Sequence, residues 1–339
     1  MGSSAVRAVG AAALRPMQFA TPTAAPDATA VFDVGNGLIS HLSRALNPAL
    51  AISMSGNPMR RSDLTICLIT DEVSPSLNEG LAFAREEGIG TVDLRVIDGR
   101  NVLALSRGEL ADAAQRVRAA GLSVSCVCTP LLKWSPPGKT SRTEGDQFGF
   151  NLGDRAPRDV YAQAFVTAEI LGARNLRIFS YLAYDDYCLD DLRAPIDDLL
   201  ALAERFDMKV HVENEGVCNI AGFAELEALM TTYRHPLLRA LPDIANAYRK
   251  SGPPSAADLA RLLPFTDILH IKDYANAARR FVAVGEGDIP IATLLAATLP
   301  NREASLTLTI ETHASSEPVA TTRRSINGLR RMVDCIGLA

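Results

Sequence analysis

The chain has 339 residues and a formal net charge of −5; 47% of its residues are hydrophobic and 22% are charged. These are ordinary values for a globular protein, and the length allows one large α/β domain or two smaller ones. Lys and Arg are scattered and no apolar run approaches the roughly 18 residues that cross a bilayer, so we expect no nucleic-acid partner and no membrane span.

The six cysteines form no C-x-x-C pair. Cys67, Cys126 and Cys128 lie in strand-like runs, where a free cysteine behaves as a small buried hydrophobe. We therefore expect a reduced, cytoplasmic protein without a disulfide framework.

Residues 1–60 differ from the rest of the chain, because they are rich in Ala, Pro, Ser, Thr and Gly and poor in acids. The first 20 residues resemble a transit peptide, but we favour a disordered extension, or an upstream start codon ahead of a start near Met54 or Met59. A short helix over 37–46 would carry no chemistry. We expect the folded domain to span residues 61–339.

From Asp63 onward, short apolar runs alternate with amphipathic segments that begin at cap residues and end at glycines. The predicted strands are 64–70, 91–96, 122–128, 175–179, 209–213, 237–243, 266–271 and 305–311. The predicted helices are 75–87, 106–120, 158–171, 190–206, 223–230, 255–263, 289–299 and 320–333.

Several local signals sharpen these boundaries. Ser74 is expected to cap the first helix, Ser255 a later one, and Ser106 with Glu109 forms a capping box. Pro242 makes the sixth strand irregular. The segment 129–155, which contains the only Trp, is predicted to be a long loop, and a loop of this length is usually functional or mobile.

Strand–helix alternation predicts a parallel sheet, and eight such units predict a (β/α)8 TIM barrel. A doubly wound open sheet is the alternative. That fold normally has a glycine-rich first turn for a phosphate, whereas residues 70–75 contain no glycine. No G-x-G-x-x-G or Walker sequence follows any predicted strand.

Four ligand-type residues end the last four predicted strands: Glu213, Asp243, His270 and Glu311. The carboxyl ends of barrel strands lie on one rim, so these side chains are expected to converge. Three carboxylates and one imidazole suit a single divalent ion, Mn²⁺, Mg²⁺, Co²⁺ or Zn²⁺. Taken singly, each residue also fits a helix cap, a surface charge or a core histidine.

Other polar residues follow the remaining strands. Three cationic residues are candidates to orient hydroxyl, carboxylate or phosphate groups of a substrate: Arg177, Lys272 and Lys133. Trp134 would stack on a sugar face or pack over the barrel mouth. His211 lies two residues before Glu213, so it shares its face and would contact a ligand or fill the barrel interior. Three more polar residues lie at strand ends: Asp71, Glu72 and Arg95. Glu286 lies in a Gly-Glu-Gly turn and is expected to have a structural role.

The region 64–329 resembles the xylose isomerase-like TIM barrels, the sugar phosphate isomerase/epimerase family that also includes endonuclease IV. The resemblance is carried by residues 68–74 (LITDEVS), 92–95 (VDLR), 177–180 (RIFS), 212–215 (VENE), 243–248 (DIANAY), 270–273 (HIKD), 285–289 (GEGDI) and 308–313 (LTIETH). The endonuclease branch fits poorly, because its three metals would need more than the five histidines present.

This resemblance implies that Glu213, Asp243, His270 and Glu311 bind one divalent metal ion. One departure concerns Asp243. The family usually has Trp or Phe before this Asp and Pro-Gly after it, whereas here the order is Pro-Asp-Ile-Ala. The loop beside Asp243 is therefore expected to differ from that of the family.

The resemblance further implies an isomerase or epimerase acting on a sugar or sugar-like hydroxy-carbonyl substrate through a metal-stabilised enediolate. Glu213 and Glu311 would flank the substrate, one removing a proton and the other returning it. A metal-dependent dehydratase or lyase, acting on a keto-cyclitol, a dehydroshikimate-like acid or an oxidised glycoside, is the alternative enzyme. A barrel that only binds a ligand is the non-catalytic alternative, and the presence or absence of a homo-oligomer is left open.

Overall fold

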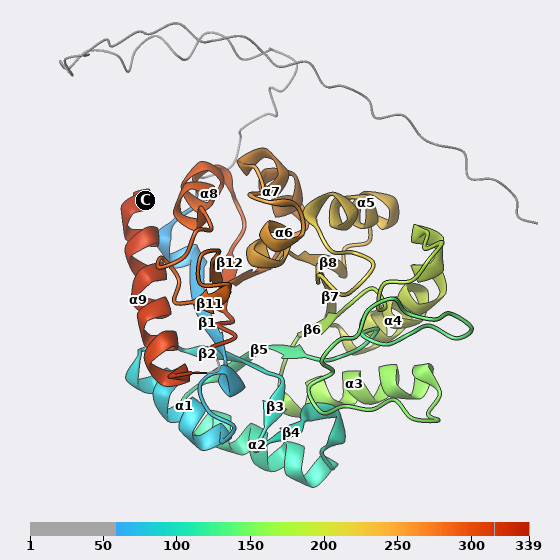
Figure 1. The fold of residues 1–339 in the computed structure, drawn as a ribbon. Helices are drawn as coiled ribbons and strands as arrows, with labels where there is room; N and C mark the ends of the chain where they lie inside the picture. The colour runs from blue at the N-terminus through green and yellow to red at the C-terminus, as the bar shows by residue number, and fades with distance from the viewer. Residues whose placement is uncertain (1–58, 315, 339) are drawn as a thin grey trace, which may run out of the picture. The chain divides into compact units, whose positions relative to one another are not determined.

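Eight parallel strands form the central sheet in the part of the chain that the computed structural model describes, residues 59–314 and 316–338. They are β1 (Leu64–Ile69), β2 (Thr91–Leu94), β5 (Ser123–Cys128), β6 (Asn175–Ile178), β7 (Lys209–Glu213), β8 (Leu238–Leu241), β9 (Ile268–Ile271) and β12 (Leu306–Ile310). Their order in the sheet is β8-β7-β6-β5-β2-β1-β12-β9, so that the last strand lies beside the first (Figure 1).

The ring closes between β8 and β9 through a sparse seam. Pro242 follows β8 and has no N–H to donate, but its carbonyl accepts a hydrogen bond from His270 N at 3.0 Å. Parallel bridges join Ala240 to Thr266 and Asp243 to His270. The predicted (β/α)8 barrel is therefore confirmed, and the irregularity expected at Pro242 falls at this seam.

The strands are buried on both faces, as their continuous apolar runs predicted. In β7, Val210 and Val212 lie on one face and His211 and Glu213 on the other, and none of the four is more than 1% exposed. Such double burial is typical of a parallel sheet that helices cover from outside. It also means that any polar residue on the inward face lies in the barrel interior.

Helices surround the sheet (Figure 1). They are α1 (Leu77–Glu86), α2 (Arg107–Ala119), α3 (Pro157–Leu171), α4 (Arg193–Phe206), α5 (Phe223–Tyr233), α6 (Ile244–Ser251), α7 (Ala256–Leu262), α8 (Ile291–Thr298) and α9 (Pro318–Ile336). Each predicted helix overlaps an observed one, and α6 is an additional helix that the sequence pattern did not predict.

The helix starts were predicted well with one exception. Ser106 and Glu109 form the expected capping box of α2, and Ser255 caps α7. The predicted cap of the first helix was wrong, because Ser76 rather than Ser74 accepts the hydrogen bond from Glu79 N. Ser74 instead donates from Oγ to the Glu79 carboxylate at 2.5 Å. Both serines precede Glu79, so the sequence alone did not distinguish them.

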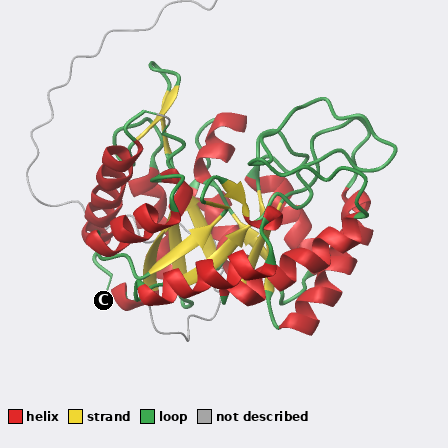
Figure 2. Ribbon diagram, turned by 90° about the horizontal axis from the view of Figure 1, so that it is seen from below, coloured by secondary structure: helices red, strands yellow, loops and turns green. Residues whose placement is uncertain are grey.

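Long loops gather at one end of the barrel (Figure 2). One is the segment between β5 and α3, which contains neither helix nor strand over residues 129–156, as predicted. The hairpin β10 (Asp273–Ala275) and β11 (Arg280–Val282) follows β9, and the hairpin β3 (Val96–Ile97) and β4 (Arg100–Asn101) follows β2. All of them follow the carboxyl ends of parallel strands, which is the end where barrel enzymes place their active sites.

Two other expectations concern the chain ends and membranes. Of the predicted N-terminal extension, only Met59 and Arg60 belong to the described residues, so the expected extension and the short helix over 37–46 lie outside them. Among the described helices, none combines the length and apolar character that crossing a bilayer demands.

Candidate metal centre

Four buried ligand-type side chains converge at the carboxyl ends of β7, β8, β9 and β12. Glu213 is the last residue of β7, Asp243 follows β8, His270 lies in β9 and Glu311 directly follows β12. One ligand atom from each lies within 4.8 Å of the others. Their exposures do not exceed 2%, so the cluster is shielded from bulk water. The structure thus brings together the four residues that the sequence predicted to converge.

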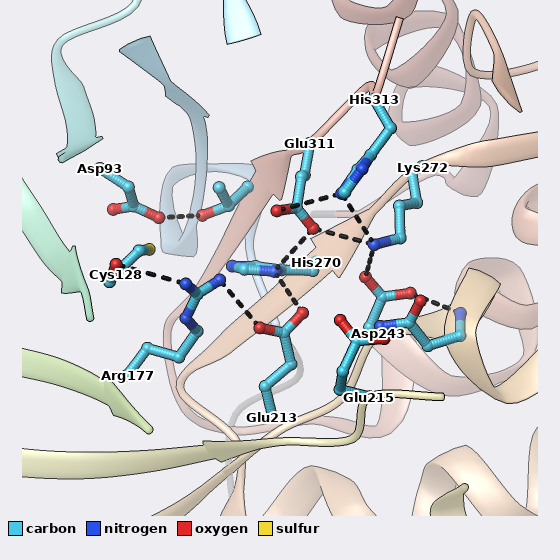
Figure 3. Close-up of polar contacts among 12 residues, drawn as sticks. Asp93, Cys128, Arg177, Glu213, Glu215, Asp243, His270, Lys272, Glu311 and His313 are labelled. Carbon is cyan, nitrogen blue, oxygen red and sulfur yellow. Dashed lines mark hydrogen bonds and ion pairs between the residues drawn. The ribbon is translucent and has the colours of Figure 1, made fainter. Parts of the chain in front are cut away.

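His270 lies between two carboxylates (Figure 3). Its Nδ1 lies 3.1 Å from Glu213 Oε1 and 3.5 Å from Glu311 Oε2. Arg177 Nη1 donates to the other oxygen of Glu213 at 3.0 Å. Burial alone would raise the pKa of Glu213, but the charges of His270 and Arg177 lower it to about 2. Glu213 is therefore held ionised.

Lys272 joins the other two carboxylates. Its Nζ lies 2.9 Å from Asp243 Oδ2 and 2.9 Å from Glu311 Oε2. Burial raises the pKa of Asp243 to about 6, against the lowering effect of Lys272. Glu311 is different, since Lys272 and His313 outweigh burial and hold its pKa well below the usual value.

Asp243 has a second role as a helix cap. Its Oδ1 accepts a hydrogen bond from Asn246 N at 2.7 Å, which caps α6. Asn214 fixes the backbone at this point, because its side-chain oxygen accepts from Asp243 N at 2.8 Å. Asp243 is thus a helix cap through Oδ1, while its Oδ2 faces Lys272 in the cluster, and its role as a metal ligand stays a prediction. In this chain α6 starts directly after Asp243.

Arg95 joins a second group of carboxylates on the side of β1 and β2. It donates to Asp71 at 2.9 Å, to Glu72 at 2.5 Å and to Glu311 at 2.8 Å. Glu72 also accepts from His313 N at 2.7 Å. Another set of grouped ligand atoms comes from Glu72, Glu311 and His313, and Arg95 donates to both carboxylates of this set.

A cavity of about 540 Å³ opens beside this cluster. It is lined by Asp71, Glu72, Arg95, Val96, Gly99, Lys133, Asp146, Phe148, Gly149 and His313. Phe148 lies in the long loop, with its ring centroid 4.3 Å from the Arg95 guanidinium and 5.0 Å from Lys133 Nζ. An aromatic ring and several cations thus lie next to the carboxylate cluster.

The predicted substrate-contacting residues lie in the cavity lining, against the carboxylates, or away from both. Lys133 lines the cavity, and Lys272 and Arg177 contact the carboxylates. Trp134 is 4% exposed and packs near Phe150, with ring centroids 6.1 Å apart. His211 is buried below the carboxylates, where Nε2 lies 2.9 Å from Asn175 Oδ1. Neither Trp134 nor His211 belongs to the cavity lining, so their contact with a substrate stays a prediction.

The donor set fits a divalent ion. Carboxylate oxygens and an imidazole nitrogen are the ligands that Mg²⁺, Mn²⁺, Co²⁺ and Zn²⁺ accept in proteins. The four ligand atoms lie within 4.8 Å of one another. Three buried carboxylates at this distance also need positive charge nearby, which Lys272, His270 and Arg177 supply in the structure.

Several residues of the site had no assigned role from sequence. Arg95 and Glu72 were noted only as strand-end residues, and Phe148 and His313 were not singled out. His313 and Phe148 both have a positive φ, 48° and 54°. Their positions depend on loop conformation, for which the sequence carries no periodic signal.

Sequence comparison agrees with this architecture. The sequence model of the family described as "Xylose isomerase-like TIM barrel" matches residues 81–332. No curated protein matches the chain.

Solved structures share the fold at low sequence identity. IOLI protein with a bound zinc atom is 13% identical, with 80% of this chain and 99% of that chain covered and a TM-score of 0.62. The probable 3-DHS dehydratase AsbF from Bacillus anthracis is 13% identical, with 78% and 98% covered and a TM-score of 0.59. The 3-keto-D-glucoside 4-epimerase YcjR from E. coli is 12% identical, with 80% and 100% covered and a TM-score of 0.57.

The match of the family's sequence model extends over most of the barrel, from α1 into α9. The strand order and the low-identity structures support the same architecture. The chain therefore belongs to the xylose isomerase-like TIM barrel family.

Proposed function

We propose that the protein is a divalent-metal-dependent isomerase or epimerase that acts on a sugar or sugar-like hydroxy-carbonyl compound. The observation that supports this most strongly is the buried cluster of Glu213, Asp243, His270 and Glu311, whose ligand atoms lie within 4.8 Å of one another. The adjoining cavity of about 540 Å³ gives room for a small polyhydroxylated molecule.

The four residues of the cluster would hold the ion. Bound there, a divalent cation such as Mn²⁺, Mg²⁺, Co²⁺ or Zn²⁺ supplies Lewis-acid polarisation of a substrate carbonyl. His270 would contribute Nδ1, since this nitrogen faces Glu213 and Glu311.

Glu213 and Glu311 are the proposed proton-transfer residues. They lie on different strands and approach His270 Nδ1 with one oxygen each, so a substrate between them is flanked by two carboxylates. One carboxylate takes the proton from the carbon next to the carbonyl, and the other residue, which has taken up a proton from solvent, delivers that proton to the substrate. Return to the opposite face gives epimerisation, and return to the adjacent carbon gives isomerisation.

Neighbouring cations contact both carboxylates. Arg177 bonds Glu213 at 3.0 Å, and Arg95 bonds Glu311 at 2.8 Å. These charges favour the ionised form of the glutamate that removes the proton, as a general base requires. Lys133 and His313, which line the cavity, are placed to bind substrate oxygens. Phe148 lines the cavity and would help to exclude water.

A metal-dependent dehydratase or lyase is the second candidate. Loss of the same proton leads to elimination when a hydroxyl or alkoxyl group sits on the next carbon and a donor protonates it. Lys133 and His313 offer such donors on the cavity wall. The fold is also shared by a probable dehydratase and by an epimerase, so both outcomes remain chemically open to this site.

Deuterium exchange tests the proposal. The protein with Mn²⁺ is incubated in D₂O with a panel of ketoses, keto acids and keto-cyclitols, and products are analysed by NMR and mass spectrometry. Solvent deuterium is expected at the carbon next to the carbonyl of at least one compound. A deuterated isomer or epimer indicates the first candidate, and a product lighter by water or an alcohol indicates the second.

Matched variants assign the exchange to the site. Glu213→Gln and Glu311→Gln should each slow exchange at least about 100-fold, the lower end of what general acid–base catalysis contributes. Glu286→Gln is the control, because Glu286 is exposed and contacts Arg324 at 2.9 Å on the surface. The proposal fails if no compound in the panel exchanges, or if the two site variants exchange as fast as Glu286→Gln.

A further inference from the structure

The edge of the His270 ring that faces away from the glutamates also lies in a buried polar environment. Its Nε2 is buried and makes no hydrogen bond of ordinary geometry. Ligand-type atoms of Asp93 and Cys128 lie within 4.8 Å of His270 and of each other, and Figure 3 shows them on the side of the ring opposite Glu311. A buried ring nitrogen without a hydrogen-bond partner carries a desolvation penalty. A hydrogen bond from His270 Nε2 to a neighbouring acceptor would remove this penalty.

Asp93 is held rigidly. It lies in β2, where Oδ1 accepts from Cys126 N at 2.9 Å and from Cys67 Sγ at 3.4 Å. Its Oδ2 accepts from Thr309 Oγ1 at 2.9 Å. A carboxylate offers about four acceptor positions, and these three contacts leave one on Oδ2. Asp93 therefore retains the capacity to accept one more hydrogen bond in a fully buried position.

Cys128 provides a second acceptor on the same side. It is the last residue of β5, and it is fully buried. Its backbone carbonyl accepts from Arg177 Nη2 at 3.3 Å, which fixes the main chain where the thiol is attached. Neither Asp93 nor Cys128 takes part in the proposed proton transfer, so the proposed chemistry leaves their burial beside His270 without a role.

We propose that Asp93 and Cys128 are positioning residues that hold the proton of His270 on Nε2 and so direct the lone pair of Nδ1 into the carboxylate cluster. This inference rests on the proposed metal centre. It adds a wall of the site, formed by β2 and β5, which lie across the closed ring of strands from β8 and β9.

The physical reason is the chemistry of imidazole. A neutral ring has one N–H and one lone pair, and the hydrogen bond at one nitrogen decides which nitrogen can bind a metal. An acceptor at Nε2 therefore pre-arranges Nδ1 as a ligand. Residues that hold a metal-binding histidine in this way typically change metal affinity by about 10–100-fold when they are replaced.

Substitution at Cys128 tests the acceptor directly. Cys128→Val removes it at similar volume, Cys128→Ser keeps it, and Asp93→Asn removes the carboxylate charge. Cys218→Val is the matched control, because Cys218 is also buried but is not part of the cluster with His270. Zn²⁺ affinity is measured by competition calorimetry, with urea unfolding as a check on folding.

Cys128→Val and Asp93→Asn should bind Zn²⁺ about 10–100-fold more weakly than Cys218→Val, whereas Cys128→Ser should stay close to wild type. Equal affinity of Cys128→Val and Cys218→Val would overturn the inference. A wild-type protein that binds no Zn²⁺ would instead overturn the proposed function on which the inference depends, so the two failures are distinguishable.

The wild-type protein gives an independent reading that needs no variant. With only five histidines in the chain, long-range ¹H–¹⁵N correlation spectra of the Zn²⁺-loaded protein can resolve each ring. The expected pattern for His270 is a proton on Nε2 and a metal-shifted Nδ1. A proton on Nδ1 with the metal on Nε2, or a thiolate charge-transfer band with Co²⁺ that Cys128→Ser abolishes, would show that the ion binds on the Asp93 side and would overturn the inference.

Discussion

Lys272 Nζ lies 2.9 Å from Asp243 Oδ2, and both side chains are buried at the carboxyl end of the barrel. The same ammonium is 2.9 Å from Glu311 Oε2. The Lys272 ammonium thus contacts two of the four proposed metal ligands, Asp243 and Glu311. Lys272 supplies positive charge to the cluster. Its contribution to the free energy of unfolding should therefore differ between the metal-free and the metal-loaded protein.

Replacement of Lys272 by Met should make the protein more dependent on metal. Without the ammonium, buried carboxylates are left unpaired, which should lower the free energy of unfolding of the metal-free protein by about 3–5 kcal/mol. Added Mn²⁺ supplies the missing charge, so the rise in Tm on metal addition should exceed that of wild type.

Lys209→Met is the control for this experiment. Lys209 pairs with Asp267 at 2.8 Å but is half exposed, so its removal should cost about 0–1 kcal/mol. Equal metal-induced shifts in Tm for Lys272→Met and wild type would contradict the proposed role of Lys272 in the cluster.

The two roles of Asp243 can be separated. Asn at this position retains a cap acceptor for Asn246 N, whereas Ala does not. We expect Asp243→Ala to be about 1 kcal/mol less stable in urea than Asp243→Asn, while both lose most of the Mn²⁺ affinity in calorimetry. Equal stability of the two variants would show that the contact with Asn246 does not contribute to capping α6.

The burial of His211 gives a pH dependence. Burial lowers the pKa of His211 to about 3, while in the unfolded chain it titrates near about 6.5. Between these values the unfolded chain binds a proton that the folded protein does not. The free energy of unfolding should therefore fall as pH falls through this window, by up to about 1.4 kcal/mol per pH unit from this residue, with no contribution above it.

His211→Gln tests this dependence, because the amide can still donate to Asn175 without titrating. Urea unfolding curves between pH 6.5 and pH 4 should show a flatter decline for the variant than for wild type. Identical slopes would mean that His211 takes up a proton in the folded protein at these pH values.

Phe148 and Phe150 should respond differently to replacement by Ala. Phe148 is partly exposed and its ring lies over Arg95 and Lys133 beside the cavity, so its loss should raise KM for the best compound of the panel with little change in stability. Phe150 is 7% exposed, and its loss should cost up to about 3–5 kcal/mol of stability. Unchanged KM in Phe148→Ala would remove Phe148 from the substrate contacts.

Much of the barrel was predictable because its strands are buried on both faces. Strands that are buried on both faces appear in the sequence as short apolar runs. For this reason β7 was predicted with its observed bounds, Lys209–Glu213. Helix α6 was missed because it is short and begins directly after Pro242 and Asp243, without an intervening polar segment. The Asp243 that marks its start was instead assigned to the end of a strand.

The convergence of Glu213, Asp243, His270 and Glu311 was predictable because parallel strands place their carboxyl ends together. Contacts made by loops were not predictable from the sequence. Phe148 reaches the cavity from the middle of the loop between β5 and α3, while Trp134, the more obvious aromatic residue, packs against that loop's own Phe150. The approach of Asp93 to His270 joins β2 to β9, which are not neighbours in the sheet, and only the closed barrel brings them together.

The most direct test of the metal centre is an anomalous difference map from crystals grown with Mn²⁺. The account predicts one strong peak within coordination distance of Glu213, Asp243, His270 Nδ1 and Glu311, about 2.0–2.3 Å from each ligand atom, and its loss in crystals of Glu311→Gln. A map without a peak at this cluster, or with the ion on Asp93 and Cys128 instead, would contradict it.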